Sequence, residues 1–298
     1  MTASHGLVKL FVDQRLERPW MGRFSEGAVG VVTRPSPLRR GANQDAACVH
    51  YVEPGAFVFA IADGLGGGPD GDIAARVALE ALTRQVQQAV PGEATLRSHI
   101  IDGIEAANRA VQRLESQAAT TLVVVEVCRG EMRSYHVGDS VALLANRQGR
   151  VKFETLSHSP VAYGVEAGMI EREDAMHHSE RHLVFNVVGT DEMRIEVGPR
   201  VPLAHRDTVI LASDGVLDNL RLEELAELAS RGRLEAAVQS SADAASRRMA
   251  NPEADEPSKP DDLTLVLFRP NPRLFDVATG INAVSQVSTG LVPDSEKV

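Results

Sequence analysis

Lysine is scarce in this sequence. Only four of the 298 residues are lysines, and arginine supplies nearly all of the positive charge. The formal net charge is −10 at pH 7, and no cluster of lysine and arginine stands out along the chain. Because contact with the phosphates of a nucleic acid requires a basic face, these features argue against a nucleic-acid partner.

Long hydrophobic runs and cysteines are also few. No apolar stretch reaches the length of a membrane-spanning helix, and the N-terminus lacks the apolar segment of a signal peptide. The two cysteines, Cys48 and Cys128, lie in apolar, strand-like sequence, which is more typical of small buried side chains in a reducing compartment than of a disulfide framework. We therefore predict a cytoplasmic protein without a membrane partner, and we expect it to be a monomer.

Aromatic residues make up only 4% of the chain, so valine, leucine, alanine and isoleucine must fill the core that 43% hydrophobic content allows. Residues 1–26 show no clear hydrophobic period and are predicted to be an N-terminal extension. A regular pattern from residue 27 to 270 predicts the main domain. Residues 271–298 are predicted to be a partly disordered tail.

Strand-like and helix-like segments come in groups within the main domain. Strands are predicted at 28–33, 46–52, 56–62, 120–127, 132–137, 141–146 and 263–268, with a further core block at 183–188, 194–198 and 207–215. Helices are predicted at 71–89, 94–118, 221–231 and 233–249. Short connections between 120 and 146 suggest a three-stranded antiparallel meander. This grouping favours an α+β layered domain over a doubly wound parallel sheet.

Several apolar segments are bounded by aspartates. Taken singly, an Asp-Gly pair is most simply a turn. Taken together, aspartates at strand ends predict a shared site, in which like charges raise one another's pKa unless cations neutralise them. The segments concerned end in Asp63-Gly64, Asp139-Ser140 and Asp214-Gly215, or begin after Asp45 and Asp261-Asp262.

Oxygen ligands without a Cys-His set at zinc spacing favour hard ions such as Mg²⁺ or Mn²⁺. A carboxylate that bridges two such ions, roughly 3.5–4 Å apart, would create a metal-bound hydroxide suited to in-line attack on phosphorus. The acidic residues therefore predict a binuclear centre for phosphate-ester hydrolysis.

With these motifs the chain resembles the metal-dependent serine/threonine phosphatases of type 2C. Each motif is weak alone, but the ordered series between residues 40 and 266 is specific. The series comprises Arg40 with Asn43-Gln44-Asp45, Asp63 to Gly67 with Gly71, Thr120-Thr121, Gly138-Asp139-Ser140, His158-Ser159 with Gly168 and Ile170, Val188-Gly189-Thr190, Asp207-Thr208 with Ser213-Asp214-Gly215, Asp218, and Asp261 with Thr264.

The resemblance implies a four-layer αββα sandwich of two antiparallel sheets flanked by helix pairs, acting on phosphoserine and phosphothreonine in protein substrates. It implies that Asp63 bridges two Mn²⁺ or Mg²⁺ ions, that the Gly64 carbonyl binds one of them, and that Asp214 and Asp261 complete the centre. Residues 162–182 fall where bacterial members carry a mobile flap that helps to choose substrates.

Three further roles follow from the resemblance. Asp45 would be a metal ligand or a partner of one, and Asp139 with Asp214 would hold the third ion found in bacterial members. Arg40 would bind the substrate phosphate, a role that suits the paired donors of a guanidinium group.

The sequence departs from the family pattern at several positions. Gln44 replaces the usual glutamate, which removes one charge beside the metals. Gly68 stands where members commonly have a histidine thought to protonate the leaving alkoxide, a step worth about 10²–10⁴-fold in rate. In addition, Val141 replaces an arginine and Asp262 an asparagine. The candidates for a replacement acid are His177, His178 and His182, but solvated surface histidines are the simpler interpretation, with water as the acid.

Two other interpretations remain. The glycines from Gly66 to Gly71 also fit a dinucleotide-binding loop, but a second helix follows the first where a parallel strand would be expected. The alternative function is a catalytically weakened module that binds metal and phosphoprotein for regulation, as Gln44 and Gly68 suggest. The retention of Arg40 together with the full set of acids favours the enzyme.

Overall fold

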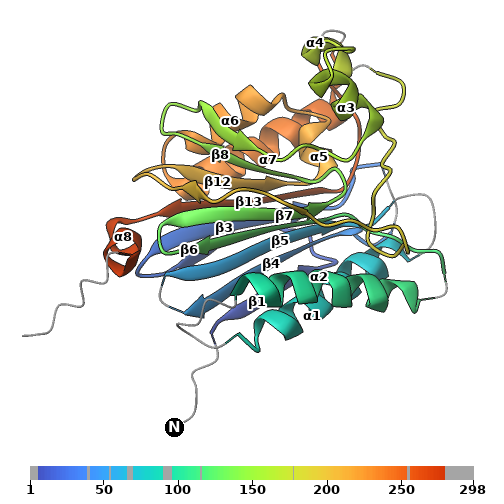
Figure 1. The fold of residues 1–298 in the computed structure, drawn as a ribbon. Helices are drawn as coiled ribbons and strands as arrows, with labels where there is room; N and C mark the ends of the chain where they lie inside the picture. The colour runs from blue at the N-terminus through green and yellow to red at the C-terminus, as the bar shows by residue number, and fades with distance from the viewer. Residues whose placement is uncertain are drawn as a thin grey trace, which may run out of the picture.

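Two antiparallel sheets packed face to face form the centre of the molecule (Figure 1). The computed structural model describes residues 6–38, 41–53, 55–65, 70–89, 96–114, 116–176, 178–253 and 256–278. The first sheet contains, in order, β1 (Val8–Val12), β4 (Asp45–Glu53), β5 (Ala56–Asp63), β6 (Leu122–Cys128), β7 (Glu131–Val137) and β10 (Glu196–Val197), and β11 (Val201–Pro202) also pairs with β7.

The second sheet has six strands. Their order is β2 (Trp20–Arg23), β3 (Gly27–Arg34), β13 (Leu263–Pro270), β12 (Thr208–Ala212), β8 (Val141–Ala145) and β9 (Val151–Glu154). The strands β3 and β13 pair along their whole length, from Gly27 opposite Pro270 to Arg34 opposite Leu263. Segments from the two ends of the domain are therefore neighbours in the middle of this sheet.

Helices cover the outer faces of both sheets (Figure 1). The first sheet carries α1 (Gly71–Val86) and α2 (Leu96–Gln112), and the second carries α5 (Asp214–Leu217), α6 (Leu222–Ser230) and α7 (Leu234–Ala250). At one end project α3 (Pro160–Glu166) and α4 (Arg172–Ala175), and α8 (Pro272–Ala278) follows β13. The predicted αββα sandwich is confirmed.

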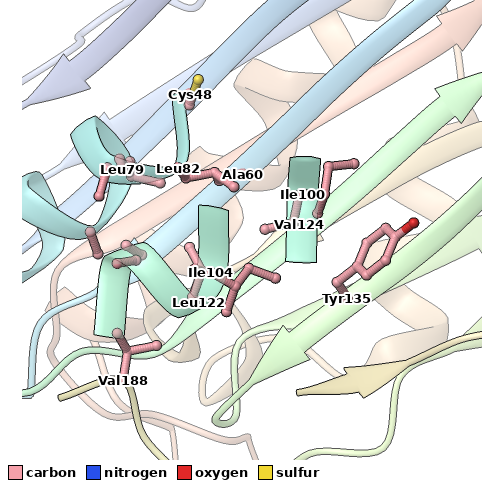
Figure 2. Close-up of a cluster of buried hydrophobic side chains, with 14 of the residues drawn as sticks. Cys48, Ala60, Leu79, Leu82, Ile100, Ile104, Leu122, Val124, Tyr135 and Val188 are labelled. Carbon is pink, nitrogen blue, oxygen red and sulfur yellow. The ribbon is translucent and has the colours of Figure 1, made fainter. Parts of the chain in front are cut away.

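The strand β5 shows why the central strands are apolar without interruption. Its alternate residues Phe57, Phe59 and Ile61 pack between the two sheets, whereas Ala60 and its neighbours on the other face pack under α1 and α2. Figure 2 shows this second layer, with Leu79 of α1 and other helix residues over the sheet. A strand that is buried on both faces lacks the polar alternation of a half-exposed one.

Three segments differ from the sequence-based expectations. Within the predicted N-terminal extension, β1 and β2 form edge strands of the two sheets. They are short and only partly buried, so they carry little hydrophobic period. Residues 183–188 are not a strand, although Val188 forms an isolated bridge with Thr120.

The predicted meander is wrong in its third strand. The strands β6 and β7 pair as expected, but β8 pairs with β12 in the other sheet. Gly138 adopts a φ of +109°, a conformation that glycine tolerates best, and a side chain there would collide with Thr121. This turn carries the chain from one sheet to the other. None of the helices in the described ranges is long and apolar enough to span a membrane.

Candidate active site

The predicted acids gather at one end of the sandwich because strand ends meet there. Asp63 ends β5 and lies directly opposite Asp45, the first residue of the antiparallel β4. In the second sheet, Asp214 follows β12 and Asp261 precedes its antiparallel neighbour β13. Antiparallel pairing brings the start of one strand beside the end of the next, so each sheet contributes two aspartates.

Asp139 joins this group from the turn that crosses between the sheets. The backbone N–H of Gly138 donates to Nδ1 of His158 at 3.0 Å, and the Thr121 and Ser140 hydroxyls are 2.8 Å apart beneath the turn. These contacts fix the backbone on both sides of Asp139. The aspartate is therefore presented where the two sheets meet.

The electrostatics show that these carboxyl groups act on one another. Burial, followed by the charges of Asp45, Asp214, Asp139 and Asp261, raises the pKa of Asp63 well above its usual range. Burial and neighbouring acids, chiefly Asp214, likewise raise the pKa of Asp45 to about 8 and that of Asp139 to about 7. All of these groups can be ionised together only if cations share the site.

The two oxygens of Asp45 differ: one is hydrogen-bonded to the protein, and the other is suited to a cation. Its Oδ2 accepts a hydrogen bond from Ser213 Oγ at 2.7 Å, and Ser213 Oγ accepts in turn from the Thr264 N–H at 2.9 Å. Its Oδ1 is buried and has no hydrogen-bond partner among the described residues. A buried, unpaired carboxylate oxygen beside other acids is suited to a hard divalent ion.

Asp262 joins two backbone segments beside the site through hydrogen bonds. One oxygen accepts the Ser36 N–H at 2.6 Å and the other accepts the Gln44 N–H at 2.8 Å. Because Asp262 is buried and precedes β13, it ties the start of β13 to the loop before Asp45. An asparagine at this position would have only one oxygen for these two donors.

Gly64 lies where two backbone segments nearly touch. A side chain at this position would come within 2.1 Å of the Gly71 carbonyl oxygen, so only glycine fits. Its N–H donates to the Gln44 carbonyl at 3.0 Å. A side chain on Gly71 would come within 2.7 Å of Gln44 Nε2, which places the Gln44 amide over the start of α1.

Lys259 is a member of the site that sequence reasoning missed. Its Nζ lies 2.7 Å from Asp218 Oδ2, 2.8 Å from Asp214 Oδ2 and 3.4 Å from Asp261 Oδ2. Burial opposes the lysine charge, but Asp214 and Asp218 outweigh it and raise the pKa of Lys259. The sequence did contain one indication of this role: Lys259 is one of only four lysines, and it stands two positions before Asp261.

A second cluster of possible ligands does not fit a metal. Among the described residues, His136, His158 and Glu196 form the one group of three whose ligand atoms lie within 4.8 Å of one another, so the aspartates are spaced more widely. His158 Nδ1 accepts from Gly138 N and from Asn186 Nδ2, so its proton is on Nε2, which donates to Glu196 at 3.1 Å. That proton lies between Nε2 and the Glu196 carboxylate, which is where a metal ion would have to bind.

A pocket of about 340 Å³ adjoins the acids beneath the predicted flap. Its wall includes Asp139, Asp214 and Asp218 on one side and α3 and α4 on the other. Arg181, at the end of the flap-like segment 162–182, donates to the Ser258 carbonyl at 3.4 Å and lies 4.0 Å from Asp218. The segment therefore borders the site, and its role as a flap stays a prediction.

The structure thus brings together Asp45, Asp63, Gly64, Asp139, Asp214 and Asp261. Arg40, Gly68 and His177 lie outside the described residues, so the roles predicted there stay predictions. His178 makes a local contact, accepting the Glu180 N–H at 3.2 Å.

Comparison with known proteins identifies the family. A family model described as protein phosphatase 2C matches residues 35–255. The serine/threonine phosphatase stp of Listeria monocytogenes serovar 1/2a is 30% identical over 199 residues, 62% of this chain and 77% of that protein. The serine/threonine protein phosphatase PstP of Mycobacterium tuberculosis H37Rv is 28% identical over 209 residues, 65% of this chain and 39% of that protein.

Solved structures agree on the fold. The serine/threonine phosphatase of S. agalactiae superposes with a TM-score of 0.70 at 23% identity, over 84% of this chain and 99% of that one. The catalytic domain of PstP in complex with two manganese ions superposes with a TM-score of 0.66 at 21% identity, over 82% and 98%. The predicted enzyme class, a protein serine/threonine phosphatase, is confirmed by the family model, and the chain belongs to the protein phosphatase 2C family.

Proposed function

We propose that the chain hydrolyses phosphoserine and phosphothreonine in proteins at a centre of two Mn²⁺ or Mg²⁺ ions. Asp63, the Gly64 carbonyl, Asp214 and Asp261 would hold the ions. The observation that carries the proposal is the meeting of aspartates from both sheets, which raises the pKa of Asp63, Asp45 and Asp139 together. The manganese ions in the PstP catalytic domain support the choice of metal.

When bound, such ions act as Lewis acids that activate water and neutralise phosphate charge. The role of the protein is to orient the carboxylate ligands and to release their protons. Ser213 fixes Asp45, so its second oxygen faces the site, and Asp45 and Asp139 give up their protons as cations enter. Asp139 with Asp214 is the proposed place of a further ion.

Substrate binding and leaving-group protonation involve residues outside the described part. Arg40 would bind the phosphate through paired N–H donors. With glycine at position 68, the leaving alkoxide takes its proton from solvent. The acidic composition argues against a nucleic-acid partner, and the family supports a phosphoprotein substrate; we further propose a cytoplasmic monomer without a membrane partner.

The second candidate is a regulatory module that binds metal and phosphoprotein with weakened turnover. Gln44 favours it, because this residue removes a negative charge from the edge of the metal site. The full set of aspartates favours the enzyme, since a binding scaffold needs fewer buried charges.

The test is hydrolysis of p-nitrophenyl phosphate and of a phosphothreonine peptide with Mn²⁺. We expect metal-dependent turnover, and a loss of about 10²-fold or more for Asp63→Asn because this carboxylate would contact both ions. The control is Asp102→Asn on the exposed face of α2, which should match the wild type. Peptide binding without metal-dependent turnover in the wild type would instead establish the regulatory module.

A further inference from the structure

Lys259 places a permanent positive charge inside the acidic site. Its ammonium group contacts carboxylates from three positions, Asp214, Asp218 and Asp261, at 2.8, 2.7 and 3.4 Å. Two of these residues are proposed metal ligands. The third, Asp218, also faces the flap residue Arg181. The ammonium group of a lysine in this position plays the part of a bound metal cation, because its positive charge attracts several carboxylates at once.

The backbone of Lys259 is fixed rather than free to move. Asn219, which is fully buried, accepts the Lys259 N–H at 3.0 Å and donates to the Lys259 carbonyl at 2.8 Å. The same Asn219 amide group donates to the Gly215 carbonyl at 2.9 Å, one residue beyond Asp214. A single buried side chain thus sets the position of Lys259 relative to the ligand Asp214.

The loop that carries Lys259 is held a second time. Ser258 Oγ donates to the backbone carbonyl of Arg248 at 2.8 Å. The Arg248 guanidinium forms ion pairs with Glu224 and Glu256 at 2.8 and 2.6 Å and donates to the Asn219 carbonyl. These contacts bind the loop to α6 and α7, so they hold the Lys259 ammonium group in place beside the acids.

We propose that Lys259 is a resident cation of the metal centre, which occupies the place of one divalent ion on the side formed by Asp214 and Asp218. This rests on the proposed metal centre. An ammonium group within 2.8 Å of both carboxylates lies between them, neutralises one of their two negative charges and repels any cation that approaches. The ion displaced is the further one that Asp139 and Asp214 would otherwise hold, so the chain would bind one ion fewer than its set of aspartates could hold.

The test counts Mn²⁺ ions bound to the full chain by equilibrium dialysis and elemental analysis. Lys259→Met should gain one equivalent over the wild type, because the carboxylates lose their ammonium partner. Lys259→Arg retains the charge and should show no gain. Adding Asp218→Asn to Lys259→Met should remove the extra equivalent. The matched control is Lys152→Met, which breaks an ion pair with Asp207 and should leave the count unchanged.

The count separates this inference from the proposed function. If the wild type binds no Mn²⁺, the metal centre itself is wrong. If the wild type binds Mn²⁺ but Lys259→Met binds the same number, or if Lys259→Arg also gains an ion, the resident-cation role is wrong.

Folding of the Lys259→Met variant is followed by thermal unfolding. The variant should have a lower midpoint than the wild type in chelator, since three carboxylates then face one another without a cation, and Mn²⁺ should restore it. A midpoint that Mn²⁺ fails to restore would also contradict the proposal.

Discussion

Asp45 and Asp207 are both buried aspartates, but their surroundings differ. Asp207 lies 2.6 Å from Lys152 Nζ and accepts the Ala204 N–H. Asp45 has a hydroxyl donor at one oxygen and nothing in the described chain at the other. The charge of a carboxylate of the first kind is compensated within the fold, so losing its partner or itself costs stability, whereas one of the second kind opposes folding until a cation binds.

Asp45→Asn should therefore stabilise the metal-free protein. The raised pKa of Asp45, from 3.8 to about 8, means that the native state holds the proton more tightly than the unfolded chain. This contribution is complete below pH 3.8 and is lost as the pH rises through 8. In chelator at pH 8 and above, the variant should gain on the order of 3 kcal/mol in unfolding free energy, fading towards pH 4.

Urea unfolding across that pH range measures the effect, with Asp207→Asn as the matched control. The control loses an ion pair and should be less stable than the wild type at pH 8. A stability loss in Asp45→Asn at pH 8 would show that the carboxylate is already satisfied without metal.

The sequence located the acidic residues but not what holds them. Each predicted aspartate adjoins an apolar strand, so its place could be inferred from the strand order that the resemblance supplied. Lys259 stands two positions before Asp261, but this alone did not place it in the site, because its position depends on Asn219, which lies 40 residues away in the chain. Long-range hydrogen bonds of this kind leave no local period in the sequence.

At the scale of elements, the start of β13 supports the site through Asp262. Its two oxygens accept N–H groups from Ser36 and Gln44, residues that lie 226 and 218 positions earlier. Since a buried donor without an acceptor costs about 1–3 kcal/mol, the identity of this residue matters for stability.

Asp262→Asn should destabilise the chain by about 1–3 kcal/mol, because one buried donor loses its acceptor. Its amide would face one of the two backbone donors and would leave that donor without an acceptor. Urea unfolding measures the loss of stability, and Mn²⁺ titration measures the effect on the site. We expect weaker Mn²⁺ binding, because Asp262 holds the Gln44 N–H and Asp45 is the next residue in the chain. For comparison, Asp261→Asn should weaken Mn²⁺ binding with little loss of stability. Equal stability of wild type and Asp262→Asn would contradict the role of Asp262 as a tie.

Elements were predicted best where they are long and buried. The apolar runs of β5 and β6 and the helical periods of α1, α2 and α7 matched the structure closely. The edge strands β1 and β2 were missed because partial exposure leaves them without a pattern. The third strand of the meander was assigned to the wrong sheet, since a short turn does not reveal that Gly138 redirects the chain.

At the scale of the whole molecule, metal binding should depend on pH. The pKa values of Asp139 and Asp45, raised to about 7 and about 8, mean that both groups are protonated in the metal-free protein at pH 6. Ligands must be deprotonated to bind, so Mn²⁺ affinity should rise from pH 6 to 8 and protons should be released on binding.

Isothermal titration calorimetry in buffers with different ionisation enthalpies measures both quantities. The number of protons released on Mn²⁺ binding should be smaller in Asp45→Asn, which has no proton to lose at that position. Removal of Mn²⁺ with chelator should lower the unfolding midpoint most at pH 8, where the unneutralised charge is greatest. Affinity that does not vary between pH 6 and 8 would contradict the assignment of these two groups.

The pairing of β3 with β13 has a consequence for how the protein is made. Without β13, the second sheet separates into β2 with β3 and β12 with β8 and β9. A ribosome produces β3 long before β13, so the nascent chain waits with β3 unpaired on that edge. Chains released before residue 261 lack both Asp261 and the tie at Asp262. Incomplete synthesis would therefore yield fragments without the assembled acidic site.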